Sequence, residues 1–255
     1  MIRLLAFASL CCVLAARAES SSHSILLGGQ YYQMQAGRGG AQTLDWVYES
    51  GKGTVYSSGF GNFALAETQW RLGRAGIARK AGGRLILGAQ ASLGSGRTGP
   101  ERFPYRVLEA KLDYLLAPRV FAKAATQHFH VAGTRGFLSS FGALFPSSRS
   151  STLDVTYNFS PGGNLRTRFF AARHDRHTSK ARFFGGAATG RTSPVLFNLG
   201  VGSAAGNKQL RQFFLGSGIP LHGAELILSF ELIRLNSVSR SAFAITFKIP
   251  ISRDR

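Results

Sequence analysis

Apolar and polar residues alternate with a period of two from about residue 24 to the end of the chain. In segment 224–232 the large apolar residues, apart from Ile227, fall at even positions, and in segment 243–251 they fall at odd positions. Segments 107–116 and 152–159 follow the same rule. Successive side chains of a strand point to opposite faces, so this pattern predicts strands with one apolar face and one polar or small face.

A direct reading gives about twelve strands, most of them close to the ~9–11 residues that a tilted membrane strand needs. They are expected at 24–35, 42–49, 62–74, 84–93, 107–116, 119–131, 152–159, 164–174, 194–202, 208–216, 224–232 and 242–251. Longer connections are expected at 94–104, 132–150 and 175–193, after even-numbered strands, whereas a membrane barrel should have them after odd-numbered ones. A missed pair at 54–60 and 136–145 would repair part of this, so fourteen strands is the alternative.

The N-terminus has the pattern of a signal peptide. Arg3 supplies the positive charge, residues 4–16 form a short apolar run, and Ala16-Arg17-Ala18 is a small-x-small cleavage site. We therefore expect residues 1–18 to be removed and residues 19–255 to form the mature domain. Both cysteines, Cys11 and Cys12, lie in the signal, which leaves no disulfide or cysteine-based site in the mature chain.

Export of a chain without a later spanning helix leaves a soluble protein beyond the inner membrane or a barrel in the outer membrane. An exported β-sandwich or lipocalin-like barrel would also show alternation. Alanine, glycine and aromatic residues are spread evenly along the strands, which favours a single antiparallel transmembrane β-barrel, an all-β fold, in the outer membrane of a Gram-negative cell.

The chain is strongly basic, with 31 Lys and Arg against 12 Asp and Glu and a net charge of +19. Such a charge usually indicates nucleic acid or an anionic surface as partner. Export argues against nucleic acid and favours outer-membrane lipid and lipopolysaccharide.

Charged residues at the polar strand positions are expected to face the lumen. The acids are Asp45, Glu49, Glu67, Glu109, Asp113, Asp154, Glu225 and Glu231, and the bases are Arg71, Arg84, Lys111, Lys123, Arg166, Arg168, Arg211 and Lys248. The two sets nearly cancel, so the basic excess should belong to loops and strand ends. Side chains of mixed sign can interdigitate and narrow the bore of a barrel of this size.

Two groups of bases flank long connections and are candidates for contact with lipopolysaccharide, because arginine matches phosphate with two parallel hydrogen bonds. The first group is Arg97, Arg102 and Arg106, and the second is Arg173, Arg176, Lys180, Arg182 and Arg191.

Catalytic and metal sites find little support. His128 and His130 could point one way from a strand, yet no third ligand lies near them in sequence, so no metal is expected. Ser139, Ser140, His174 and Asp175 could be combined into a hydrolase triad only on paper, because serine is abundant here. No catalytic residue and no cofactor is assigned.

Two stretches of the chain carry a family resemblance. The first is Gly218-Ile219-Pro220-Leu221 with the strands 224–232 and 242–249, and the second is 106–121 with its turn Leu116-Ala117-Pro118-Arg119. In these stretches the chain resembles the YaiO-like family of small outer-membrane barrels. The chain departs from the usual pattern at its end, where Ser252-Arg253-Asp254-Arg255 follows Ile251 in place of a terminal aromatic residue. The resemblance implies a plain barrel or a barrel attached to tetratricopeptide segments in envelope and exopolysaccharide systems.

These observations together predict a non-enzymatic outer-membrane barrel that acts as a narrow channel or as an envelope or exopolysaccharide-export component. An outer-membrane enzyme acting on lipid or lipopolysaccharide is one alternative, and a barrel that docks an export partner is another.

Overall fold

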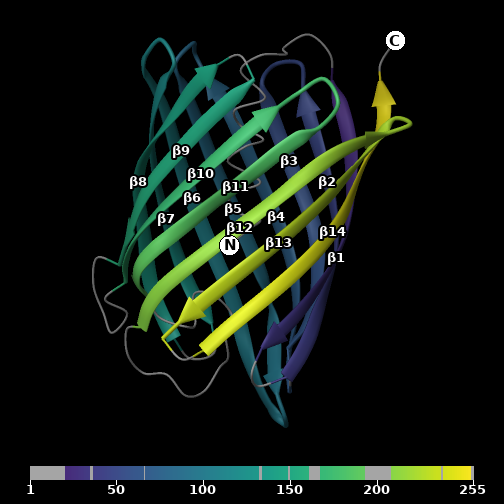
Figure 1. Cartoon of the computed structure of the whole chain (residues 1–255), viewed down its shortest axis with the longest axis vertical. Coiled ribbons are helices and arrows are strands. Elements are labelled where there is room, and N and C mark those ends of the chain that lie inside the picture. The colour runs from purple at the N-terminus through teal and green to yellow at the C-terminus, as the bar shows by residue number, and fades with distance from the viewer. Residues whose placement is uncertain are drawn as a thin grey trace.

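The chain forms one closed antiparallel β-barrel of fourteen strands (Figure 1). The computed structural model describes residues 21–34, 37–65, 67–131, 134–148, 150–160, 167–192, 208–236 and 238–253. The strands are β1 (Ser22–Met34), β2 (Gly37–Ser50), β3 (Thr54–Leu65), β4 (Thr68–Ala81), β5 (Leu85–Thr98), β6 (Glu101–Ala117), β7 (Val120–Val131), β8 (Thr134–Ser148), β9 (Ser151–Phe159), β10 (Arg168–His177), β11 (Arg182–Thr192), β12 (Lys208–Leu221), β13 (Ala224–Leu235) and β14 (Val238–Arg253). No helix among these residues is long and apolar enough to cross a membrane.

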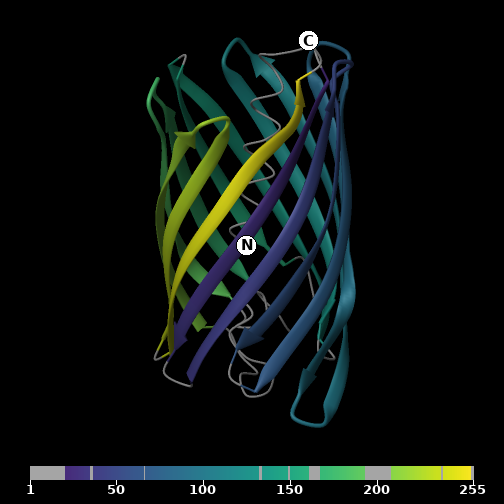
Figure 2. The same cartoon turned by 90° about the vertical axis from the view of Figure 1, so that its right-hand side faces the viewer.

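The barrel closes between its first and last strands, which lie side by side in Figure 2. The register of β1 on β14 runs from Ser22 opposite Arg253 to Met34 opposite Arg240. Every other strand pairs with its two neighbours in sequence. Closure therefore gives each strand a hydrogen-bonding partner on both sides, which is the condition for a sheet to lie in lipid.

The two ends of the barrel differ. We call the end where β1 begins and β14 finishes the terminal end, and the opposite one the far end. Connections at the terminal end are short, such as 51–53 between β2 and β3 and 82–84 between β4 and β5. The longest connections, 160–167 and 193–207, join β9 to β10 and β11 to β12 at the far end. Long connections thus follow odd-numbered strands, as expected for a membrane barrel.

The prediction of twelve strands is wrong, and the alternative of fourteen is correct. Segment 54–60 belongs to β3 and segment 136–145 to β8, as the alternative proposed. The expected loop 175–193 contains β11, and the expected loop 94–104 is a tight hairpin between β5 and β6. The strand expected at 194–202 lies outside the described residues.

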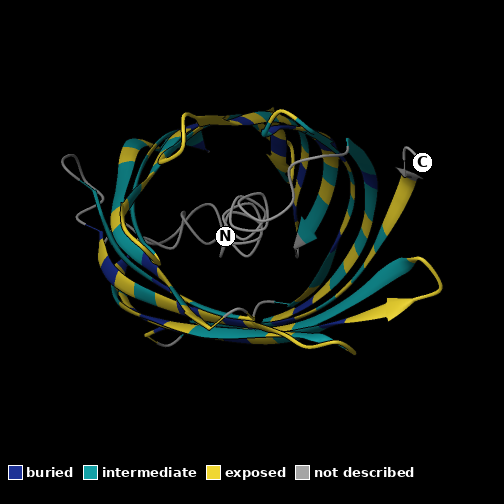
Figure 3. Cartoon of the chain, turned by 90° about the horizontal axis from the view of Figure 1, so that it is seen from above, coloured by how far each residue is buried: buried dark blue, intermediate teal, exposed yellow. Residues whose placement is uncertain are grey.

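The wall is apolar on its outer face. Along β14, Phe243, Ile245 and Phe247 are exposed, with 46%, 39% and 43% of their surface accessible, while Ala242 between β13 and β1 is buried. The same alternation continues around the ring, where exposed and less exposed residues succeed one another along each strand (Figure 3). Large apolar side chains that face away from the barrel axis form the surface that lipid requires.

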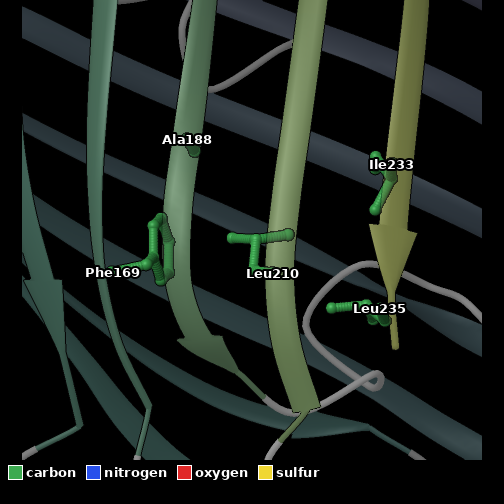
Figure 4. Packing of buried hydrophobic residues seen from close by; sticks show 5 residues of the cluster. All are labelled: Phe169, Ala188, Leu210, Ile233 and Leu235. Carbon is green, nitrogen blue, oxygen red and sulfur yellow. The ribbon is translucent and has the colours of Figure 1, made fainter.

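Apolar side chains also gather on the inner face, toward the far end. One cluster is Phe169, Ala188, Leu210, Ile233 and Leu235, which lie on four consecutive strands from β10 to β13 (Figure 4). A second cluster is Tyr32, Ala41, Trp70 and Ala242, with Phe63, Leu72, Phe103 and Tyr105 packed against it. We call these inward side chains the apolar collar. The interior therefore changes from charged to apolar toward the far end.

Candidate functional site

Most of the charges predicted for the lumen do lie on the inner face. Along its strand, each of these residues falls at the positions that alternate with the exposed apolar residues of the outer face, and buried residues occupy the same set of positions. These inward residues are Asp45, Glu49, Glu109, Lys111, Asp113, Lys123, Asp154, Glu225, Glu231 and Lys248.

The remaining charges of that prediction are placed elsewhere. Arg71, Arg168 and Arg211 are exposed and share the outer face with Ile77, Phe170 and Phe213. Glu67 lies in the turn before β4 and Arg84 in the turn before β5. Arg166 lies outside the described residues. Arg71 was assigned to the lumen within a single strand expected at 62–74. In the structure this segment contains the end of β3, a turn and the start of β4.

Other inward charges escaped the sequence analysis, namely Arg74, Arg173, Asp175, Arg182 and Arg240. Each of the four arginines forms an ion pair with a carboxylate on the inner face, and Asp175 is that carboxylate for two of them. The inner wall still carries similar numbers of acids and bases: the predicted Lys111, Lys123 and Lys248 lie there, and arginines that were not predicted take the place of the other bases. The interior charge is thus nearly balanced, as predicted, but several of the residues that carry it differ from those predicted.

The first pair joins strands that are not neighbours. Asp45 on β2 and Arg74 on β4 are both register partners of Gly59 on β3. Their side chains meet over this glycine in a close ion pair in which the Arg74 Nε donates to Asp45. A Cβ at Gly59 would fall 2.0 Å from the Asp45 Oδ1. The pair therefore depends on the missing side chain of Gly59.

The most connected carboxylate is Asp175, which is only 4% exposed. Arg182 donates to it with two hydrogen bonds, from Nε at 2.9 Å and from Nη2 at 2.6 Å. Arg173 adds a third bond of 2.8 Å from its own Nη2. Both guanidinium groups also lie over the ring of Phe184, at 5.2 and 5.6 Å from its centroid. Bidentate, charge-assisted bonds of this kind hold the three side chains against the wall.

A second buried carboxylate, Glu231, lies on β13 next to the apolar collar, which begins two residues further along the strand at Ile233. It is 2% exposed and accepts hydrogen bonds from Gln212 Nε2 at 2.6 Å and from Arg240 Nη2 at 2.9 Å. The Arg240 guanidinium also lies 5.2 Å from the centroid of the Tyr32 ring, which belongs to the collar.

Two lysines complete the inner network. Lys111 Nζ lies 3.1 Å from the Glu109 Oε1 on its own strand, and Lys123 on β7 forms a close ion pair with Asp154 on β9. Like the pair over Gly59, the second of these spans an intervening strand, here β8. Since most of the inner charges are paired, the interior offers no uniform field for cations or anions.

The predicted lipopolysaccharide contacts divide between the two ends and the two faces. Arg97, Arg102 and Arg106 are exposed on the outer face near the far end, as is Arg191. Arg176 lies on the outer face and Lys180 in a turn, both at the terminal end. Arg173 and Arg182 point inward to Asp175 and are removed from this set. The second group was misassigned because the segment it was drawn from contains two strands and a turn.

The residues weighed for catalysis do not assemble into a triad. His174 and Asp175 are successive residues of β10, so they point to opposite faces. His174 Nε2 lies 2.6 Å from the Ser151 Oγ on the outer face, while Asp175 is bound to arginines inside. In the part of the chain that the structure describes, no three His, Cys, Asp or Glu side chains gather as metal ligands would.

A groove of about 940 Å³ crosses the outer face over β1 to β5 and β14. Its lining includes Leu27, Leu44, Phe60, Leu93 and Phe247, with Arg71 at one edge. The outward residues that line the groove form two neighbouring rows across the strands, one polar and one apolar. Arg71, Asn62 and Gln42 form a polar row along the ladder, and the next outward row toward the terminal end holds Phe60, Leu44 and Leu27.

The fold is that of known outer-membrane barrels. A monoaromatic hydrocarbon channel, CymD, superimposes with a TM-score of 0.62 at 12% sequence identity, covering 96% of this chain and 91% of that one. A mutant of the TodX monoaromatic hydrocarbon channel gives a TM-score of 0.62 at 9% identity, covering 93% and 91% of the two chains. The outer-membrane protein Omp33 of Acinetobacter baumannii gives 0.57 at 8% identity, covering 90% and 99%.

The sequence matches no protein-family model and no curated protein. At these identities the structural likeness establishes the fold of this chain, a single antiparallel barrel of the outer-membrane type.

Proposed function

We propose that this chain is a narrow, non-enzymatic channel of the Gram-negative outer membrane. The observation that carries the proposal is the closed wall with an apolar outer face and a polar inner face of nearly balanced charge. Such a wall can sit in lipid and enclose a path for solute. The far end, with its long connections, would face the exterior, and the terminal end would face the periplasm.

The interior supports a preference for uncharged solutes. Most inward acids are paired with inward bases, as in the pairs over Gly59 and around Asp175, so an ion gains little from the wall. At the far end a solute would meet the apolar collar. There the indole N–H of Trp70 is buried without an acceptor among the described residues.

Small aromatic solutes are the class to test first. Two of the structures with this fold are described as monoaromatic hydrocarbon channels, and the collar here presents the rings of Tyr32, Trp70 and Phe103. Aromatic rings favour edge and offset contacts with one another, which would retain a ring-bearing solute at the mouth. For the role in envelope or exopolysaccharide export that the YaiO-like resemblance implies, we find no comparable feature among the described residues.

Reconstitution into lipid vesicles and planar bilayers tests the proposal. Purified protein is expected to give a small single-channel conductance with weak ion selectivity. In swelling assays glucose should enter faster than glucuronate, which has a similar size and a negative charge. Phenyl glucoside should compete with glucose, and Trp70→Ala should weaken that competition. Absence of conductance and of swelling in correctly folded protein would refute the channel.

A further inference from the structure

Arginines line the outer face of the barrel toward the far end. Each lies in the half of its strand nearer that end, and each is exposed. We call this set the arginine rim: Arg38, Arg71, Arg97, Arg102, Arg106, Arg135, Arg168, Arg191, Arg211 and Arg234. On the outer face of the terminal half, the described strands carry only Arg79 and Arg176. The positive charge of the outer face is thus concentrated at one end.

Within the described strands, no carboxylate shares an outward position with these arginines. Every Asp and Glu there falls at an inward position of the alternation, although Glu101, the first residue of β6, is exposed beside Arg102; Glu67 lies in a turn. Lysine is also missing from the outer face of these strands, although Lys111, Lys123 and Lys248 are used inside. Arginine differs from lysine in presenting a planar fork of donors that matches phosphate. The choice of arginine therefore indicates phosphate as the counterion.

Several rim arginines face one another directly. Arg97 on β5 is the register partner of Arg102 on β6. The other facing pairs are Arg168 with Arg191, and Arg211 with Arg234. Side chains directly opposite on adjacent strands come within about 4.5–5.5 Å at Cβ, and like charges there destabilise the sheet. A bound anion between two guanidinium groups would convert this repulsion into attraction.

The outer groove adds a place for hydrocarbon beside this charge. Its polar row contains Arg71 and its apolar row contains Phe60 and Leu44. Gly73 lies in the apolar row between Phe60 and Leu93, and a Cβ placed on it would approach no atom closer than 3.9 Å. The groove thus has open space next to an arginine, an arrangement that suits a lipid with a phosphorylated headgroup and an acyl chain.

We infer that the arginine rim and the outer groove form a binding surface for lipopolysaccharide, with the phosphates of lipid A between rim arginines and an acyl chain in the groove. The inference rests on the outer-membrane location in the proposed function, because the far end must meet the outer leaflet. The surface keeps Arg97, Arg102, Arg106 and Arg191 from the sequence prediction and adds arginines that had been assigned to the lumen or had not been selected. It excludes the inward Arg173 and Arg182, and also Arg176 and Lys180, which lie at the terminal end.

Native mass spectrometry of the full-length protein in detergent tests this surface with defined lipids. The probes are bisphosphorylated lipid A, its dephosphorylated form and cardiolipin. We expect bisphosphorylated lipid A to bind on the order of tenfold more tightly than the dephosphorylated form. The triple variant Arg71→Gln/Arg97→Gln/Arg102→Gln should lose most of that difference. The matched control Arg79→Gln/Arg176→Gln, at the terminal end of the same face, should keep it.

A second variant tests the groove independently of charge. Gly73→Leu should fill the groove and weaken both forms of lipid A, while Ala75→Leu, one outward position nearer the terminal end, should leave binding unchanged. If the triple variant fails to fold, Arg168→Gln/Arg191→Gln tests a facing pair on the other side of the barrel. Heat-dependent mobility in gel electrophoresis identifies the folded variants.

Three outcomes would overturn the inference. They are equal binding of the phosphorylated and dephosphorylated forms, binding of cardiolipin as strong as that of lipid A, and an equal loss in the terminal-end control. Conductance measured on the same preparations separates this inference from the proposed function. A conducting protein that ignores lipid A refutes the lipid surface alone, and a protein that binds lipid A without conducting refutes the channel alone.

Discussion

Asp45 and Arg74 form an ion pair across an intervening strand because the residue between them in the register is Gly59. Replacing Gly59 with Ala should separate the pair, since the new Cβ would lie 2.0 Å from the Asp45 Oδ1 and 2.6 Å from the Leu44 carbonyl oxygen. We expect a loss of about 1–3 kcal/mol in the free energy of unfolding, as for other overpacked sites. Urea denaturation in detergent measures it.

Gly29→Ala is the matched control for that substitution. Nothing lies within 4 Å of a Cβ at Gly29, so stability should be unchanged. Equal losses for both variants would show that strand glycines matter through the backbone and that the ion pair is incidental.

Asp175→Asn should be among the most destabilising single changes inside the barrel. It leaves Arg173 and Arg182 buried on the wall without the carboxylate that both of them bind. Breaking a buried pair in this way typically costs about 3 kcal/mol or more. Glu49→Gln removes the same formal charge from an inward carboxylate that forms no ion pair with any of the described residues, and it should cost less than about 1 kcal/mol. Thermal shift of the gel mobility compares the two, and similar shifts would contradict the role of Asp175.

Two successive residues of β13 test which face meets lipid. Phe230 is 38% exposed on the outer face, and Ser229 points inward opposite Gly216 and Ala244. Phe230→Glu should impair assembly at a cost of up to about 2 kcal/mol, because a carboxylate would enter the hydrocarbon region. Ser229→Glu should assemble normally. The reverse order of the two yields, measured as folded protein in vesicles, would invert the two faces.

Removing one arginine from a facing pair should stabilise the protein in a detergent that carries no phosphate. Arg102→Gln relieves the repulsion from Arg97, and we expect a gain of about 0.2–1 kcal/mol in the free energy of unfolding. Added lipid A should cancel or reverse this gain, since it stabilises the native protein with both arginines. Arg79→Gln serves as the control. A gain of the same size in this variant would show that the stabilisation does not come from relief of repulsion between facing arginines.

Cleavage after Ala18 remains a prediction from the short apolar run and the small-x-small site. Protein recovered from the cell envelope should begin at Glu19 when its N-terminus is sequenced. Recovery with Met1 in place would contradict export by this signal.

The barrel class was predictable wherever alternation is regular. In β9 the apolar residues keep strict period two, and in β6, β13 and β14 they keep it over much of the strand, where the inward charges Glu109, Glu231 and Lys248, like Asp154 in β9, were assigned to the inner face. The strand β11 was missed because Gly185-Gly186-Ala187-Ala188 replaces large apolar residues with small ones on both faces. Period two is invisible in such a segment.

The ion-pair partners were not predictable, because they depend on register. The side chains of Asp175 and Arg182 are brought together only once β10 and β11 are recognised as a hairpin, and Asp45 reaches Arg74 only across β3. The apolar collar was missed for a different reason. Inward positions near the far end, such as Phe63 and Trp70, are apolar, so the rule that polar residues face the lumen fails there.

The pairing of β1 with β14 also constrains the order of assembly. The register partner of Ser22 is Arg253. The free edge of β1 therefore finds its partner strand only after β14, the last strand of the chain, has been synthesised. Until then the chain exposes two unsatisfied edges, which can pair with other chains. Loop-closure entropy makes so distant a contact slow to form. A truncation that removes β14 should therefore leave an open, aggregation-prone sheet, and a chaperone that shields the β1 edge would have to be released only when the chain is complete.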